Sequence, residues 1–269
     1  MHRLLVDTAL LAEEAPVLPA DAAKHLRVVR PREGEPIELF DGRGSWRSYV
    51  YTRSGLRPQP DSRTIRTIEQ SNNSLTLFAC VTKGSRWDWT IEKATELGVT
   101  RIVPVISDRT IVRIPKAERA AKRERWLRIA EDAARQSDAK WLPEITETVD
   151  FKDSLALVSE TTCFIGALTT PPSPLLAEAL SSRLSAIEQS TNPTNRPLEQ
   201  STNPNNRTID QSHLATFIGP EGDFTPDELA ALMAIAVPVS FGPTVLRAET
   251  AAIFALSVIL ANYPLVKQG

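Results

Sequence analysis

The stretch LTLFACVTKGSRWDWTIEKATELGVTRIVPVIS (75–107) decides the fold class. Residues 75–82 form a continuous apolar run, which is typical of a strand buried on both faces. Residues 87–97 carry apolar side chains at helical spacing and are followed by Gly98, a residue common just beyond helix ends. Residues 101–107 form a second apolar run. This order of strand, helix and strand predicts a parallel sheet covered by helices.

The same alternation continues toward the C-terminus. Further helices are predicted near residues 117–136, 174–184, 226–236 and 248–261, and further strands at 163–168, 215–219 and 238–242. We therefore expect an α/β domain over residues 71–269.

Residues 1–70 have a different pattern. Residues 37–40 and 46–52 flank an Asp-Gly turn, which predicts a hairpin, and residues 22–30 read as one short helix that ends before Pro31. Several short strands with one helix predict a small β-barrel.

An 11-residue repeat interrupts the α/β pattern: IEQSTNPTNRP (187–197) is followed by LEQSTNPNNRT (198–208). The repeat is rich in Asn, Ser, Thr and Pro and cannot build a core. We interpret residues 187–212 as a low-complexity surface insertion. A related fragment at residues 66–74 is interpreted as an interdomain linker.

The composition limits the classes of function. Apolar residues make up 42% of the chain, and 31 Lys and Arg balance 33 Asp and Glu, so nucleic-acid binding requires a local basic surface. No apolar run approaches the length of a membrane span, and acids near the N-terminus do not fit a signal peptide, so we expect a cytoplasmic protein without membrane contact. Cys80 and Cys163 lie outside any zinc-binding spacing, which predicts buried free thiols and no metal site.

The positive charge is concentrated between Arg109 and Arg128, where eight basic residues occur with only two acidic ones. On a helix, these residues can form a basic face that contacts RNA phosphates, although an ordinary solvated helix surface explains them as well. The candidates for RNA binding are Lys83, Arg86, Arg109, Arg113, Arg119, Lys122 and Arg123.

Three loops at predicted strand ends, residues 166–169, 218–224 and 241–250, are the candidate ligand site. In parallel α/β sheets, ligands bind beyond the carboxyl ends of the strands. The second loop leads into Thr225, whose spacing to Glu228 predicts a capping box that fixes the helix start. An ordinary strand–helix connection is the alternative, and neither a P-loop nor a GxGxxG motif is present.

Arg247 and Glu249 begin the apolar helix after the third loop. Glu249 suits the positive end of a helix dipole, whereas Arg247 opposes it. Arg247 therefore needs another reason to be there, and an anionic substrate is one.

Four groups of motifs together resemble a known family. They are KGSRWDW with IEKATELG (83–98), ERW with AARQS and LPEI (124–145), IGPEG (218–222) and GPTVLRAETA (242–251). The family is the bacterial 16S ribosomal RNA (uracil-N3)-methyltransferase, RsmE, of the SPOUT class. The resemblance covers nearly the whole chain apart from residues 185–212.

The resemblance implies a PUA-like RNA-binding β-barrel over residues 1–70 and a SPOUT α/β domain with a trefoil knot over residues 71–269. It implies a homodimer, S-adenosylmethionine as the methyl donor, and 16S ribosomal RNA as the substrate, within the small ribosomal subunit. Arg247 and Glu249 are the catalytic candidates. The residues predicted to bind S-adenosylmethionine are Leu168, Ile218, Gly219, Pro220, Glu221, Gly222, Phe241, Gly242, Val245, Leu246 and Arg247.

The sequence departs from the family pattern where Asp223 replaces a Gly and Ala248 replaces a Thr. Asp tolerates unusual backbone angles, so the first change is compatible with the loop, and it adds a carboxylate near the cofactor. Three alternatives stay open: a SPOUT enzyme acting on another RNA such as transfer RNA, a non-catalytic RNA-binding protein, and a nucleotide-dependent oxidoreductase. The last is disfavoured by the missing GxGxxG motif.

Overall fold

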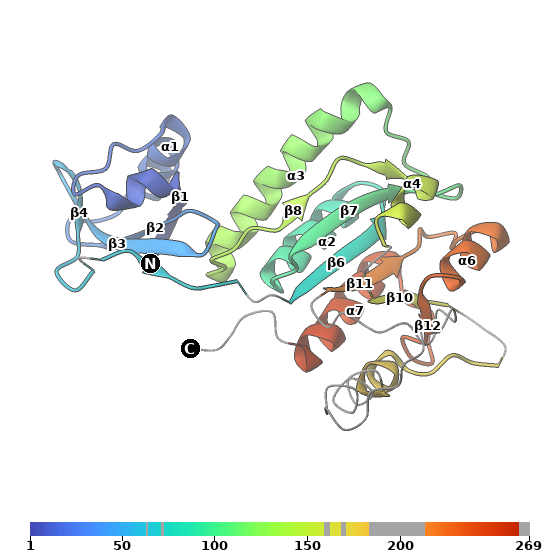
Figure 1. Ribbon diagram of the computed structural model, residues 1–269. Helices are drawn as coiled ribbons and strands as arrows, with labels where there is room; N and C mark the ends of the chain where they lie inside the picture. Colours follow the sequence, from blue (N-terminus) through green and yellow to red (C-terminus); the bar gives the residue numbers. More distant parts are fainter. Residues whose placement is uncertain (63, 71–72, 159–161, 168–170, 183–212, 264–269) are drawn as a thin grey trace.

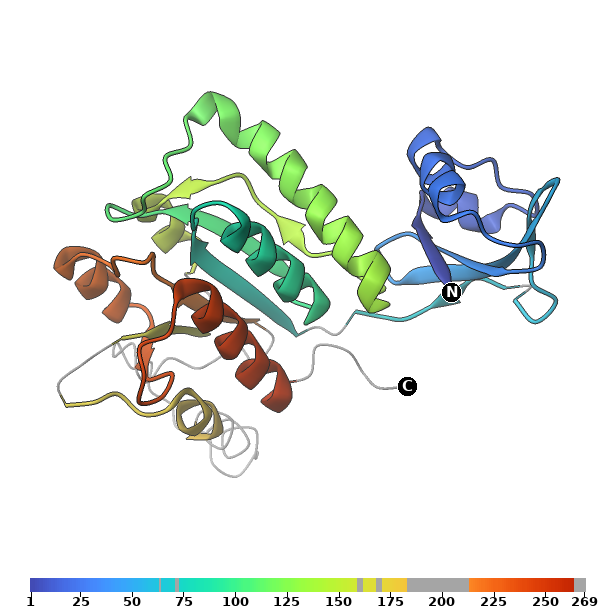
Figure 2. The ribbon, with the colours of Figure 1, turned by 180° about the vertical axis from the view of Figure 1, so that it is seen from behind.

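The computed structural model describes residues 1–269 apart from 63, 71–72, 159–161, 168–170, 183–212 and 264–269. Figures 1 and 2 show a small N-terminal body at one end of a larger α/β body, next to one end of the long helix α3 (Lys116–Ser137). Leu168 and the repeat at 187–212 lie outside the described residues.

The N-terminal body is a mixed five-stranded sheet with the strand order β1-β2-β3-β4, in which β5 also pairs with β3. Its elements are β1 (His2–Leu5), η1 (Thr8–Ala12), α1 (Ala20–Val29), β2 (Pro36–Phe40), β3 (Ser45–Thr52), β4 (Gly55–Pro58) and β5 (Arg66–Thr67). The predicted hairpin is confirmed, since β2 pairs antiparallel with β3 from Pro36 and Val50 to Phe40 and Trp46. The expected linker begins within the sheet, because β5 belongs to it.

The C-terminal body is a seven-stranded sheet with the order β12-β10-β11-β6-β7-β8, in which β9 also pairs with β7, and every pairing is parallel. Its strands are β6 (Ser74–Cys80), β7 (Arg101–Ile106), β8 (Glu144–Ile145), β9 (Val149–Asp150), β10 (Thr162–Gly166), β11 (His213–Ile218) and β12 (Val237–Val239). Besides α3, its helices are α2 (Ser85–Glu96), α4 (Phe151–Ala156), α6 (Pro226–Met233) and α7 (Ala248–Asn262), and residues 176–182 are also helical. The predicted parallel α/β sheet is confirmed; β8, β9 and α4 are additions that the sequence did not predict.

Strand β6 explains why the sheet is covered on both sides. Leu75 and Leu77 pack with α2, α3 and α7, whereas Phe78 and Cys80 pack with α4 and α6 on the other face. Both sets of side chains are almost completely buried. The continuous apolar run therefore reflects burial on both faces.

Both cysteines are buried free thiols, as predicted. Burial raises the pKa of the Cys80 thiol to about 11 and also raises the pKa of Cys163. Both thiols stay protonated at neutral pH and are poor nucleophiles. No described helix has the length and apolar character needed to cross a membrane.

Arg3 joins the two bodies. Its Nε donates to Glu38 Oε1 at 2.7 Å, and its other nitrogens donate to the carbonyl oxygens of Ala134 and Ala139 at the C-terminal end of α3. Lys140 Nζ donates to the same Glu38 oxygen at 2.7 Å. The side chains of Arg3 and Glu38 are only 5% and 4% exposed, so this ion pair is shielded from water.

We expect Arg3→Ala to destabilise the protein and to loosen the N-terminal body. The substitution leaves Glu38 buried with one cation and removes donors from two carbonyls, a type of change that costs about 3 kcal/mol or more. Thermal unfolding should show a lower Tm, and limited proteolysis should cut faster between residues 66 and 74. The control is Arg53→Ala, because the Arg53 side chain is exposed where it pairs with Glu33, and its loss should change the Tm little. Equal behaviour of the two variants would contradict the prediction.

Candidate functional site

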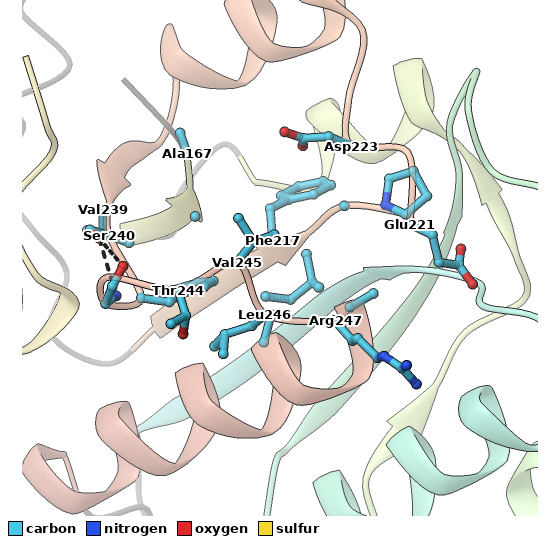
Figure 3. Close-up of a pocket in the computed structure, with 18 residues that line it drawn as sticks. Ala167, Phe217, Glu221, Asp223, Val239, Ser240, Thr244, Val245, Leu246 and Arg247 are labelled. Atoms are coloured by element: carbon cyan, nitrogen blue, oxygen red, sulfur yellow. Dashed lines mark hydrogen bonds between the residues drawn. The ribbon is translucent and has the colours of Figure 1, made fainter. Parts of the chain in front are cut away.

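The ends of three neighbouring strands form a pocket of about 330 Å³. Strands β10, β11 and β12 are adjacent and parallel, so their carboxyl ends reach the same edge of the sheet. The start of α7 closes the pocket (Figure 3). Its walls consist of Gly166, Ala167, Phe217, Ile218, Gly219, Pro220, Glu221, Asp223, Val239, Ser240, Phe241, Gly242, Thr244, Val245, Leu246, Arg247, Ala248 and Ala251. The three predicted loops therefore meet in one site.

Gly166 and Phe241 lie against each other in one wall of the pocket. A Cβ at Gly166 would lie 2.4 Å from Phe241 Cε2, a distance that side chains do not adopt. The Phe241 ring also packs on Phe254 of α7, with the ring centroids 5.9 Å apart. The absence of a side chain at residue 166 lets this ring lie against the end of β10.

The loop after β11 forms a hydrogen-bonded turn that contains Asp223, one of the two residues that depart from the sequence pattern described above. The Asp223 amide donates to the Pro220 carbonyl at 3.0 Å, and its φ is 59°. This left-handed conformation favours glycine but is tolerated by aspartate, so Asp223 is compatible with the turn at a position where the resemblance implies glycine. Its Oδ1 accepts from the Phe224 amide at 2.8 Å.

The predicted capping box at the start of α6 is confirmed. Thr225 Oγ1 accepts from the Glu228 amide at 3.2 Å, and Glu228 Oε2 accepts from the Thr225 amide at 2.9 Å. These reciprocal bonds fix where α6 begins and so fix the end of the loop.

The loop after β12 is held by a serine hydroxyl. Ser240 Oγ accepts from the Gly242 amide at 3.2 Å and donates to the Gly242 carbonyl at 3.3 Å. Gly242 has a φ of 116°, which side-chain-bearing residues rarely adopt. Ser240 was not predicted as a site residue, because it falls inside the strand expected at residues 238–242, whereas β12 ends at Val239.

Arg247 is the N-cap residue of α7 and lies at the edge of the pocket. Its exposed side chain makes no hydrogen bond or ion pair with another described residue. Figure 3 shows the guanidinium directed outward, on the Glu221 side of the pocket. The arginine can therefore meet an anion brought to this opening.

Glu249 lies in the first turn of α7 but does not line the pocket. Its Oε2 is buried and accepts no hydrogen bond from the described residues. A buried carboxylate oxygen without a donor is costly, so this oxygen can take a donor from outside the described chain.

Most of the predicted cofactor residues are in the wall. The predicted residues that line the pocket are Ile218, Gly219, Pro220, Glu221, Phe241, Gly242, Val245, Leu246 and Arg247. Gly222 lies outside the lining. Five further wall residues belong to the three predicted loops but not to the predicted cofactor set: Gly166, Ala167, Asp223, Thr244 and Ala248. Four lie outside those loops and were not predicted: Phe217, Val239, Ser240 and Ala251.

The basic residues do not form one free face on α3. Arg119 pairs with Asp150 at 2.5 Å, and Arg123 donates to the Ile145 carbonyl at 2.6 Å. Arg113 donates to two carbonyls of its own loop, and Arg109 donates to the loop after β11.

Lys83 and Arg86 lie at the start of α2. Arg86 is 3.2 Å from Glu221 and therefore reaches the pocket loop. Lys83 is exposed, Lys122 of α3 is half-buried, and neither has a hydrogen bond or ion pair with another described residue. Among the described residues, these two lysines are the candidates whose charge is not already engaged.

The chain matches the family described as an RNA methyltransferase domain over residues 69–260. It is 30% identical over 268 residues to the ribosomal RNA small subunit methyltransferase E of Synechocystis sp., spanning 97% of this chain and 77% of that protein. It is 29% identical to the protein of the same name from Mycobacterium bovis, spanning 95% of this chain and 88% of that protein. It is also similar to the crystal structure of a ribosomal RNA small subunit methyltransferase E from Neisseria gonorrhoeae bound to S-adenosyl methionine. That likeness has a TM-score of 0.74 and 26% identity and covers 98% of both chains.

We expect Gly166→Ala to weaken binding of S-adenosylmethionine about tenfold, because the new methyl group must displace the Phe241 ring, which lines the pocket. Calorimetric titration measures this affinity. The double variant Gly166→Ala/Phe241→Leu should recover part of it, since the obstructed ring is gone. Wild-type affinity in the single variant would show that the pocket does not hold the cofactor at this wall.

Proposed function

Because the chain belongs to the RNA methyltransferase family, among the ribosomal RNA small subunit methyltransferases E, we propose that it methylates N3 of a uridine in 16S ribosomal RNA of the small subunit. It is an S-adenosylmethionine-dependent ribosomal RNA methyltransferase. The observation that carries the proposal is the pocket itself, with Arg247 at its edge, a cation that has no partner among the described residues.

The pocket has features that suit S-adenosylmethionine. Its volume of about 330 Å³ is at the lower end of the usual range for ligand sites. Apolar side chains such as Ile218 and Leu246 suit the adenine ring, and Gly219 and Gly242 allow the ligand to approach the backbone. The carboxylates of Glu221 and Asp223 suit the positive charge of a sulfonium and an ammonium group. When bound, this cofactor supplies an electrophilic methyl carbon.

Arg247 is the residue that we assign to the substrate. Removing the N3 proton of uracil leaves negative charge on the base, and the guanidinium of Arg247 beside the base stabilises that charge. The walls contribute by holding the two reactants in line, which supplies much of the rate in a displacement reaction.

Glu249 is assigned a supporting role. Glu249 does not line the pocket, so it is not placed to remove the uracil proton directly. We assign its buried carboxylate to holding a hydrogen-bond donor near Arg247. The proton released from N3 passes to solvent water at the exposed edge of the pocket, where Arg247 lies.

The larger features of the family are part of the same proposal. We propose that the N-terminal sheet is the PUA-like RNA-binding module, that the α/β body contains the SPOUT trefoil knot, and that two chains form a homodimer. Family membership and the likeness to the Neisseria gonorrhoeae protein support them. Light scattering of the purified protein tests the dimer.

A transfer RNA substrate is the second candidate for this fold. Methylation assays with purified small subunits, naked 16S ribosomal RNA and transfer RNA, each followed by mass spectrometry of the nucleosides, separate the candidates. N3-methyluridine formed only in transfer RNA would overturn the proposal and leave the reaction class intact.

We expect Arg247→Ala to lower single-turnover methylation by about 100-fold, the scale seen when one donor to developing charge is removed. Affinity for S-adenosylmethionine should change little, because the interaction strengthens in the transition state. Arg247→Lys should recover only part of the rate, since it keeps the charge and loses the planar fork. Near-normal turnover of Arg247→Ala would remove this residue from the catalytic assignment.

We expect the double variant Lys83→Ala/Lys122→Ala to bind RNA more weakly and with less salt dependence. For each lysine that neutralises a phosphate, its removal should reduce the slope of log affinity against log salt by about 0.7 to 0.9. Fluorescence anisotropy at several salt concentrations measures the slope. The control is Lys152→Ala, because this exposed lysine of α4 lies outside both the candidate set and the N-terminal sheet. An unchanged slope would return these lysines to the role of ordinary solvated side chains.

A further inference from the structure

The loop between β7 and α3, residues 107–115, is fastened to the loop after β11. Arg109 Nη1 donates to the Gly222 carbonyl at 3.0 Å and to the Phe224 carbonyl at 3.2 Å. These carbonyls flank Asp223, the residue with a φ of 59°. One guanidinium nitrogen therefore spans the left-handed turn.

Glu228 makes a second connection between the same loops. Its Oε2 completes the capping box of α6, and its Oε1 accepts from the Asp108 amide at 2.9 Å. Glu228 is only 6% exposed, which shields these bonds from water. The carboxylate that starts α6 thus also holds the residue next to Arg109.

The fastened residues pack directly on the pocket. A Cβ at Gly219 would lie 3.3 Å from Asp223 Oδ1 and 3.2 Å from Phe224 Cε2. Both Gly219 and Asp223 line the pocket, and Phe224 packs on Phe217, another wall residue, with ring centroids 6.2 Å apart. A change in the turn at Asp223 must therefore change the wall.

We propose that Arg109 is a positioning residue for the cofactor loop, and that it raises affinity for S-adenosylmethionine by holding residues 222–224 in place. The inference rests on the proposed function of the pocket. It replaces the expectation that Arg109 contacts RNA, because a phosphate drawn to Nη1 would compete with both carbonyls.

The test compares Arg109→Ala with wild type and with Arg125→Ala. Arg125 is a matched control, since its guanidinium donates to Asp88 of α2 and not to the cofactor loop. Calorimetry should show about tenfold weaker binding of S-adenosylmethionine to Arg109→Ala, the loss expected for a charge-assisted hydrogen bond, and wild-type binding to the control. The KM for S-adenosylmethionine should rise by a similar factor while kcat at saturation stays near wild type. Arg109→Lys should restore part of the affinity.

RNA affinity and its salt dependence should be unchanged in Arg109→Ala, and the Tm without ligand should fall only slightly, because the Arg109 side chain is exposed. Wild-type affinity for S-adenosylmethionine combined with weaker RNA binding would overturn the inference and return Arg109 to the RNA surface. A lower Tm with equal loss of both affinities would overturn it as well, because the residue would then be merely structural. Failure of the wild-type protein to bind S-adenosylmethionine would instead count against the proposed function.

Discussion

The parallel pairing of β12, β10 and β11 is the constraint on which the site depends. The carboxyl ends of neighbouring parallel strands lie at one edge of the sheet. The loops that follow these strands therefore lie side by side at that edge, where ligands bind. The pairing in turn needs apolar side chains on both faces of the sheet, which Leu77 and Phe78 illustrate on neighbouring positions of β6. Burial of the sheet on both faces therefore forms the core and also brings the pocket loops together.

Each pocket loop is held in place by hydrogen bonds or packing contacts with a group at the rim of the cavity or outside it. Ser240 holds Gly242, the capping box holds the start of α6, and the Phe241 ring fills the space left by Gly166. Such contacts fix the backbone before a ligand arrives, which lowers the entropy lost on binding. The site is therefore made of loops but positioned by helix starts and strand ends.

Local pattern was sufficient to predict the longer helices and strands of the α/β body, the three loops and the capping box, because each depends on residues close together in the chain. Partners distant in sequence could not be predicted. Arg109 and Gly222 are separated by 113 positions, and nothing near Arg109 distinguishes an arginine that holds a carbonyl from one that meets a phosphate. The short strands β8 and β9, each of two residues, lack enough length for an alternating pattern to be visible.

Helix α3 sets the distance between the N-terminal body and the pocket, the two parts that we propose contact the substrate. Its N-terminal end follows the loop fastened to the pocket, and its C-terminal end receives Arg3 from the N-terminal body. At 22 residues it is roughly 33 Å long. An RNA held by the N-terminal body and the pocket of the same chain must therefore extend over about this length, far beyond a single nucleotide. A single nucleotide cannot do so, whereas a longer RNA can, and this favours a polymeric RNA substrate over an isolated uridine.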